Sequence, residues 1–166
     1  MVRAKSVPLI SSRKDRYRSD DKGEAISVGT SYKMLVDAAG ACLFGTQVGG
    51  GLPLCEWMNA VTGWDLSNDE YLLTGERIEQ LRHAFNIREG LNPIRDFRPH
   101  PRVYGDPPLT RGPLEGVTLD VDALAKSYYD AMSWDPGTGM PDIAKLRELA
   151  LIEVIETFYP NEPEAD

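Results

Sequence analysis

One short segment combines residue types that could do cofactor chemistry: Asp37, Gly40 and Cys42 follow one another at intervals of three and two residues. In a helix they would fall within about one and a half turns. The carboxylate could accept paired hydrogen bonds from an amino-heterocycle, the glycine would let a flat cofactor approach the backbone, and the thiolate could bind iron or act as a nucleophile. The same residue types also occur in ordinary helices, where a buried cysteine packs as a small apolar side chain. The segment on its own leaves both interpretations open.

The remaining candidates favour structural roles. Cys55 lies beside Trp57 in an apolar segment and is expected in the core. His83 is expected at the surface or at the edge of the core rather than as a ligand, and His100 lies between prolines in a loop. The sequence contains no His-x-x-x-His or Cys-x-x-Cys pair, which argues against a zinc site. The count of two cysteines would permit a Cys42–Cys55 disulfide, but nothing in the sequence indicates an oxidising compartment.

The net charge of −8 on the 166 residues divides unevenly along the chain. Residues 1–22 hold seven basic and three acidic side chains, whereas residues 23–166 hold eleven basic and twenty-three acidic ones. An acidic body argues against a general nucleic-acid binder, because phosphate contacts need a basic face. We expect residues 1–30 to form a basic, poorly ordered head and residues 160–166 to form an acidic tail.

The sequence lacks membrane and secretion signals and a full set of iron–sulfur ligands. No apolar run approaches the roughly 20 residues that span a bilayer, and the first residues lack the apolar stretch of a secretory signal. We therefore expect a cytoplasmic protein without a membrane span. Two cysteines and two histidines are also too few for a self-contained four-thiolate iron–sulfur site.

Helical periodicity dominates residues 31–159, and alternation of period two is nearly absent. Ser67 and Glu70 form a capping box ahead of an apolar stripe, and Asp120 is placed to cap another helix. Residues 91–118 hold six of the twelve prolines and predict a long Pro-rich surface connection. The predicted fold class is all-α, a multihelical domain. Its predicted helices span residues 32–44, 54–61, 68–89, 120–132 and 141–149, and residues 151–158 either continue the last helix or pack as a separate turn.

Two of these helices carry specific expectations. The helix at 32–44 places Gly40 in its middle, where glycine costs about 1 kcal/mol relative to alanine and usually has a reason, such as a close approach to the backbone. The helix from residue 68 is expected to bury one stripe and to expose its polar residues. The inward stripe is Leu72, Gly75, Ile78, Leu81 and Phe85, and the mostly outward residues are Glu76, Arg77, Glu79, Gln80 and Arg82.

Several short motifs occur in a fixed order along the chain. They are Asp37-x-x-Gly-x-Cys42-Leu-Phe, Thr62-Gly-Trp-Asp65, Thr74-Gly-Glu-Arg-Ile78, Phe85-Asn-Ile-Arg-Glu-Gly90, Tyr128-Tyr129, Trp134-Asp135, Thr138-Gly-x-Pro141 and Lys145-Leu146. Over roughly residues 32–151 this order resembles the C-terminal portion of the tungsten-dependent aldehyde ferredoxin oxidoreductase family. The combination of Gly-Glu-Arg-Ile with Phe-Asn-x-Arg-Glu-Gly at this spacing is specific, and the resemblance implies an all-helical region.

The resemblance also implies cofactors. Members of that family bind tungsten, or molybdenum, on two pterins together with a [4Fe–4S] cluster. By this resemblance Asp37, Gly40 and Ala41 contact a pterin, and Cys42 is the fourth cluster ligand. The family commonly has Leu where this chain has Ala41, a difference that concerns the local backbone packing.

The family's other three cluster cysteines, its other pterin segment and its N-terminal domain have no counterpart in this sequence. The resemblance therefore implies a fragment of a longer enzyme or one piece of a split enzyme, inactive alone. Its partners would be the missing N-terminal part or subunit and ferredoxin or a similar electron carrier. The reaction would oxidise an aldehyde to an acid or reduce a related carbonyl compound. The alternative is a non-catalytic helical module that kept the fold and binds a partner polypeptide.

Overall fold

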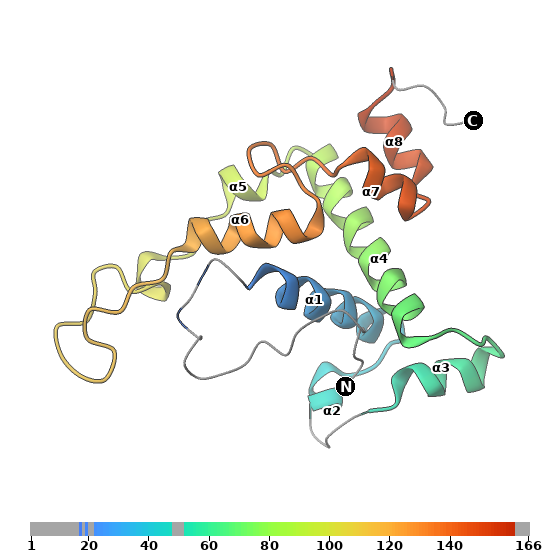
Figure 1. The fold of residues 1–166 in the computed structure, drawn as a ribbon, viewed down its shortest axis with the longest axis horizontal. Helices are drawn as coiled ribbons and strands as arrows, with labels where there is room; N and C mark the ends of the chain where they lie inside the picture. The colour runs from blue at the N-terminus through green and yellow to red at the C-terminus, as the bar shows by residue number, and fades with distance from the viewer. Residues whose placement is uncertain (1–16, 18, 20–21, 48–51, 162–166) are drawn as a thin grey trace.

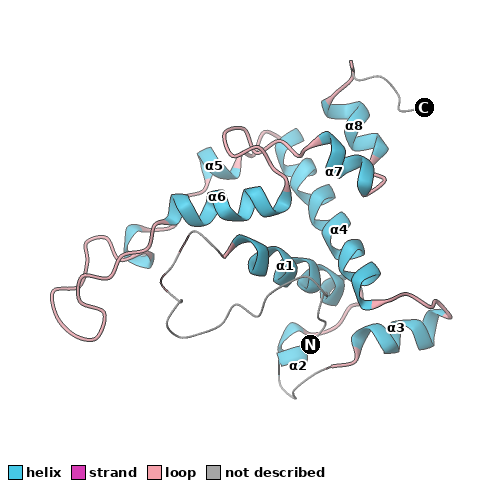
Figure 2. Ribbon diagram, in the orientation of Figure 1, coloured by secondary structure: helices cyan, strands magenta, loops and turns pink. Residues whose placement is uncertain are grey.

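The computed structural model describes residues 17, 19, 22–47 and 52–161. Within these residues the chain forms helices, loops and isolated bridges but no strand (Figure 2), which confirms the predicted all-α class. None of the helices in these ranges is long and apolar enough to cross a membrane. The elements are α1 (Gly23–Ala38), α2 (Leu43–Gln47), α3 (Leu54–Thr62), α4 (Asn68–Arg88), α5 (Pro93–Asp96), the 3-10 helix η1 (Pro101–Val103), α6 (Val121–Met132), α7 (Ile143–Glu148) and α8 (Ile152–Phe158).

Helix α1 packs against both α4 and α6 near the centre of the molecule (Figure 1). Two glycines allow these close contacts. A Cβ atom on Gly75 of α4 would lie 2.0 Å from the carbonyl oxygen of Ser31, and a Cβ atom on Gly23 would lie 1.8 Å from that of Ser127. The Gly23 N–H also donates to the Ser127 hydroxyl at 2.8 Å. Because any side chain at these positions would push the helices apart, glycine sets the spacing of the three helices.

The buried apolar side chains form separate clusters along α4. The first joins α1, α3 and the start of α4 and comprises Leu35, Val36, Leu54, Cys55, Tyr71 and Leu72. The second joins the later part of α4 to α7 and α8 and comprises Ala84, Leu146, Leu149, Leu151, Val154 and Ile155. A smaller third cluster contains Tyr129, Met132 and Trp134. Helix α4 is therefore the element that links the two larger clusters (Figure 1).

The predicted helix caps are confirmed. The Glu70 N–H donates to the Ser67 hydroxyl at 3.3 Å, and the Ser67 N–H donates to the Glu70 carboxylate at 2.7 Å, which completes the capping box. The Ser67 N–H and the Ser67 hydroxyl, which donates to the same carboxylate at 2.7 Å, lower the pKa of Glu70. Asp120 accepts a hydrogen bond from the Ala123 N–H at 2.9 Å at the start of α6. Local signals of this kind can be read from sequence because both partners lie within one turn.

The first helix differs from its prediction at both ends. It begins at Gly23 rather than at residue 32 and ends at Ala38 rather than at residue 44. Residues 23–30, predicted as part of a poorly ordered head, are helical. Residues 23–31 carry few large apolar side chains, so the apolar periodicity did not reveal this part of the helix. Small residues such as Gly23 pack it against α6 instead. The rest of the predicted head apart from residues 17, 19 and 22, and most of the predicted tail, at residues 162–166, lie outside the described residues.

The burial pattern of α4 also differs from the single stripe that was predicted. Gln80 was expected outside and is fully buried, whereas Leu81 and Phe85 were expected inside and are 51% and 53% exposed. Neighbouring segments cover α4 on more than one side, so its packing does not follow one face. Further along, residues 91–118 contain α5 and η1, for which no element was predicted. Ala150, with φ of +52°, separates α7 from α8, so the last segment is a separate helix.

Candidate cofactor-binding segment and a separate cavity

The segment from Asp37 to Cys42 forms the end of α1 rather than the middle of a helix. The Gly40 N–H donates to the Asp37 carbonyl at 3.0 Å, and the Ala41 N–H donates to the Val36 carbonyl at 3.0 Å. With φ of +67° at Gly40, this is a Schellman ending, in which glycine takes the left-handed conformation that stops the helix. The prediction of a continuous helix through Gly40 is therefore wrong.

The space beside Gly40 is open. No atom of the described residues lies within 4 Å of the place where its Cβ would be, apart from the immediate backbone neighbours. The glycine is therefore required by its own backbone conformation and not by packing within the described part of this chain. The same open backbone would accept a flat group from outside, and that contact stays a prediction.

Asp37 lies in the last turn of α1 with its side chain 48% exposed. Its carboxylate accepts a hydrogen bond from the Lys33 ammonium at 2.5 Å, one turn earlier. Exposed pairs of this kind contribute about 0.2–1 kcal/mol. The Asp37 carboxylate could therefore exchange Lys33 for better-placed donors at little cost.

The two cysteines have different environments. Cys42 is exposed in the short segment between α1 and α2. Cys55 is 3% exposed in the first cluster, and burial raises the pKa of its thiol. Its predicted core position is confirmed. Both thiols are free, so the Cys42–Cys55 disulfide that the cysteine count permitted is not formed.

The donors at this end of α1 fit part of a cofactor site. Among the described residues no group of three or more His, Cys, Asp or Glu side chains is placed to hold one metal ion. A [4Fe–4S] cluster takes four protein ligands. The exposed Cys42 could supply one of these and Asp37 could supply a hydrogen-bond acceptor, but the other ligands would have to come from elsewhere.

Large apolar side chains are exposed at the same end of the molecule. Phe44 in α2 is 75% exposed, Trp57 and Val61 in α3 are 53% and 88% exposed, and Trp64 is 55% exposed. Helices α2 and α3 follow the C-terminal end of α1 along the chain and lie below it and below the start of α4 in Figure 1. Exposed apolar side chains gathered in one region are typical of a surface that packs against another protein part.

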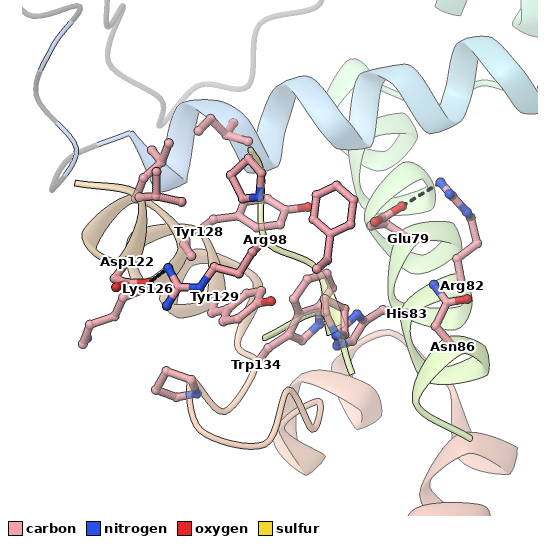
Figure 3. Close-up of a pocket in the computed structure, with 18 residues that line it drawn as sticks. Glu79, Arg82, His83, Asn86, Arg98, Asp122, Lys126, Tyr128, Tyr129 and Trp134 are labelled. Atoms are coloured by element: carbon pink, nitrogen blue, oxygen red, sulfur yellow. Dashed lines mark hydrogen bonds and ion pairs between the residues drawn. The ribbon is translucent and has the colours of Figure 1, made fainter. Parts of the chain in front are cut away.

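A cavity of about 620 Å³ lies toward the other end of α1 (Figure 3). The described residues that line it come from α1, α4, α6 and the segments 93–99 and 134–136. Ile26, which lines the cavity, precedes Asp37 by eleven residues on the same helix, or about 16 Å along its axis. The cavity and the segment from Asp37 to Cys42 are therefore two separate places.

A buried polar network lies behind the part of the cavity wall that His83 and Trp134 form. The Gln80 amide donates to the Met132 carbonyl at 2.6 Å and accepts from the Trp134 indole N–H at 2.7 Å. The His83 ring stacks on Trp134, with 3.5 Å between ring centres and 11° between planes. The His83 Nε2 lies 2.6 Å from the Gly139 carbonyl, to which it donates. These contacts fix α4 against the turn that follows α6.

The two histidines also differ in environment. His83 is 4% exposed, so the prediction of a surface or core-edge position is wrong. Burial lowers the pKa of His83, and its bond to the Gly139 carbonyl partly opposes this effect. His100 lies in a loop as predicted, and its Nδ1 accepts a hydrogen bond from the Arg102 N–H at 3.2 Å where η1 begins.

Sequence reasoning missed the cavity and its polar wall. Gln80 and His83 are three residues apart, which places them on the same side of a helix, but Trp134 lies 54 residues beyond Gln80. No local pattern connects such distant residues. The order of motifs, not the chemistry of a single segment, identified Asp37 and Cys42.

Comparison with known proteins agrees with that order of motifs. The family described as "Aldehyde ferredoxin oxidoreductase, domains 2 & 3" matches residues 2–151. Proteins named tungsten-containing aldehyde ferredoxin oxidoreductase are 33% identical over 135 residues in Pyrococcus horikoshii, 34% over 135 in Pyrococcus furiosus and 32% over 137 in Thermococcus kodakarensis. These alignments cover 81–82% of this chain but only 22% of each relative. The chain thus belongs to the aldehyde ferredoxin oxidoreductase family, in the region described as its domains 2 and 3.

Proposed function

We propose that this chain is the C-terminal part of a tungstopterin and iron–sulfur oxidoreductase that acts on an aldehyde or a related carbonyl compound. The observation that carries the proposal is the contrast between its cysteines: Cys42 is exposed at the end of α1, whereas Cys55 is enclosed in the core. When bound, the metal–pterin group would supply the two-electron chemistry and the cluster a path to ferredoxin or a similar carrier.

The end of α1 suits the role of holding a pterin. The Asp37 carboxylate can accept two hydrogen bonds, so it can meet an amine and a ring N–H side by side. Gly40 leaves the adjacent backbone uncovered, and Ala41 carries a small side chain there. These three residues would therefore orient a flat heterocycle rather than react with it.

Cys42 suits the role of a single cluster ligand. It follows Gly40 by two residues, so a thiolate there would lie close to a pterin held by Asp37. Since Cys55 is buried, this chain offers one accessible thiol and the remaining ligands would belong to another part of the enzyme. The span of 22% of the relatives' length is consistent with such a missing part.

The exposed apolar side chains of α2 and α3 would be covered by that missing part. A non-catalytic module that binds a partner polypeptide would use the same side chains, and their exposure alone favours neither role. The two candidates differ at Cys42, because only a cofactor-binding chain needs a thiolate there.

The test compares two cysteine variants in the complete enzyme, in which this chain is joined to or assembled with the part that carries the other three cluster cysteines. Cys42→Ser should lower iron content and abolish the cluster signal in electron paramagnetic resonance, since an alcohol stays protonated near neutral pH and binds iron poorly. Electron transfer to the external carrier should fail first, while tungsten is retained. Cys55→Ser should leave iron and tungsten in place and change only stability.

Two results would contradict the proposal. Loss of iron in Cys55→Ser with retention in Cys42→Ser would show that the motif is aligned wrongly. Retention of iron in both variants would show that this part does not line the cofactor site and would favour the partner-binding module. The 166-residue chain alone should be colourless and contain no tungsten, molybdenum or iron, because two cysteines are too few for the cluster.

A further inference from the structure

The cavity between α4 and α6 is built differently from the cofactor-binding segment. Its volume of about 620 Å³ falls within the range of small-molecule sites, roughly 300–1,000 Å³. A cavity of roughly 150 Å³ already accommodates benzene, so this one has room for two fused rings. The residues that line it belong to this chain, so ligand binding can be tested on the 166-residue chain, separately from the function proposed above.

Aromatic side chains dominate the walls of the cavity. Tyr128 meets Trp134 edge-on at 5.5 Å, and Tyr129 meets it at 5.6 Å with the planes tilted by 56°. His83 covers one face of Trp134. Phe97, which also lines the cavity, is 75% exposed and leaves a ring surface available for stacking. These surfaces suit a flat aromatic ligand.

Charged side chains on the walls are already paired within the chain. Glu79 accepts from Arg82 at 3.0 Å, and Arg98 lies 2.7 Å from Asp122. Lys126 lies 2.6 Å from Asp130, a neighbour on α6. A charged ligand would have to displace one of these partners, so the walls favour a ligand without net charge.

A buried hydroxyl in the cavity makes no hydrogen bond to the described residues. Tyr129 is 9% exposed, and within the described residues its hydroxyl makes no hydrogen bond. Burial without a compensating bond raises the pKa of this hydroxyl. Figure 3 shows the Tyr129 hydroxyl directed from α6 toward α4, into the cavity. An unsatisfied buried hydroxyl is costly, and a ligand oxygen that accepts its hydrogen would remove that cost.

We propose that this cavity binds a neutral one- or two-ring aromatic compound whose oxygen accepts a hydrogen bond from Tyr129. The rings lie against Phe97 and the Tyr128–Trp134 wall, and the paired charges remain at the rim. Ile26 in the site lies about 16 Å from Asp37 along the axis of α1, so its ligand does not replace the pterin.

Binding is measured on the 166-residue chain by nuclear magnetic resonance with 2-acetylnaphthalene as the ligand. Saturable shifts are expected at the Trp134 indole N–H and at the Tyr129 amide, with a Kd of about 1 mM or tighter for a ligand of this size. The anion 2-naphthoate and the non-aromatic cyclohexyl methyl ketone should bind at least threefold more weakly. If 2-naphthoate bound as tightly as 2-acetylnaphthalene, the assignment of a neutral ligand would be overturned. If cyclohexyl methyl ketone bound as tightly, the assignment of an aromatic ligand would be overturned.

Three variants test the geometry. Tyr129→Phe keeps the ring and should weaken 2-acetylnaphthalene binding about three- to tenfold, the effect of one hydrogen bond. Ala125→Trp places a large side chain on the lining of the cavity and should abolish the shifts at Trp134. Tyr104→Phe, outside the cavity, is the control and should bind like the unchanged chain. Unchanged affinity in both Tyr129→Phe and Ala125→Trp, or shifts confined to other residues, would overturn the proposal.

Discussion

The two ends of helix α1 differ in whether their polar side chains are exposed or lie near buried, hydrogen-bonded groups. At its C-terminal end an exposed carboxylate, an open glycine and an exposed thiol stand beside exposed apolar side chains. Toward its N-terminal end α1 joins α4 and α6 around a cavity, and a buried and largely satisfied polar network lies behind one part of its wall. The C-terminal end of α1 exposes its polar and apolar side chains, whereas the region around the cavity buries its polar side chains in hydrogen bonds within the chain.

This difference predicts which substitutions affect the stability of the 166-residue chain and which affect only cofactor binding in the complete enzyme. The cavity is formed by α1, α4, α6 and the segments 93–99 and 134–136, so its integrity should follow the stability of the 166-residue chain. The exposed side chains of Asp37 and Cys42 contribute little to that packing, so changes at these two residues should leave stability nearly unchanged and appear only when cofactors are present. Substitutions at the two ends should therefore separate stability from cofactor binding.

The largest effect on stability is expected where α1 and α4 touch. Gly75→Ala would place a Cβ atom 2.0 Å from the Ser31 carbonyl oxygen, so the helices must separate. We expect a loss of about 3 kcal/mol or more in the free energy of unfolding, at the upper end of overpacking effects. Denaturant unfolding followed by circular dichroism measures the change.

Gly29→Ala is the matched control, because it lies in α1 with no atom within 4 Å of its would-be Cβ. Alanine there should stabilise the chain by about 0.5–1 kcal/mol through helix propensity. Equal effects of the two substitutions would show that the contact between α1 and α4 does not set the spacing on which the cavity depends.

The next effect is expected in the polar wall. Gln80→Leu removes both bonds of a fully buried amide and leaves the Met132 carbonyl and the Trp134 indole N–H without a partner. We expect a loss of about 2–4 kcal/mol, from two unsatisfied buried groups. A double-mutant cycle with Trp134→Phe, which removes the indole N–H, measures the coupling. Strictly additive losses would mean that the two side chains do not stabilise one another.

A smaller, pH-dependent effect is expected at His83. Its pKa in the folded chain is below the ordinary value of 6.5, so the unfolded chain binds more protons between these two values. The stability due to neutral His83 is therefore complete above about pH 6.5 and decreases as the pH falls toward the folded pKa. Each unit of depression corresponds to about 1.4 kcal/mol.

Unfolding midpoints measured from pH 7.5 to 5.5 test this dependence. His83→Phe keeps a ring against Trp134 but cannot titrate, so its stability should vary less over this range. His100→Phe, in the exposed loop, should keep the original slope. Desolvation raises the pKa of Glu79, so its protonation increases the stability of the folded chain as the pH falls, opposite to the effect of His83. Glu79 is unchanged in all three proteins, so its effect does not distinguish them. An unchanged slope in His83→Phe would exclude His83 as the source.

Local and long-range contacts also differ in how far the sequence could predict them. The caps at Ser67 and Asp120 were predictable because both partners of each bond lie within one turn. The end of α1 carried a usable signal, a glycine after an apolar helix, but Gly40 was assigned to the helix interior. The burial of Gln80 and His83 depends on Trp134, which only the folded chain brings near them. The all-α class and the family could thus be predicted, and the cavity could not.

The smallest effect on stability and the sharpest contrast are expected at Asp37. In the 166-residue chain Asp37→Asn loses only its exposed pair with Lys33, and a carboxylate in the last turn also opposes the helix dipole. We therefore expect a change within about 0.5 kcal/mol. Asp130→Asn is the matched control, since Lys126–Asp130 has the same i,i+4 spacing, similar exposure and a distance of 2.6 Å. Both variants should unfold like the unchanged chain.

In the complete enzyme the two variants should differ. If the Asp37 carboxylate holds a pterin as proposed, the Asp37→Asn side chain would present an amide N–H where a pterin N–H needs an acceptor, whereas Asp130 lies on α6 and not in the segment from Asp37 to Cys42. The loss of a charge-assisted hydrogen bond, about 1.5–3 kcal/mol, corresponds to a roughly ten- to hundredfold decrease in pterin affinity. Pterin and tungsten content of the purified enzyme, measured against protein, gives the occupancy. Equal occupancy in Asp37→Asn and Asp130→Asn would show that the exposed carboxylate at the end of α1 is an ordinary surface charge, and the contrast between the two ends of the helix would then rest on Cys42 alone.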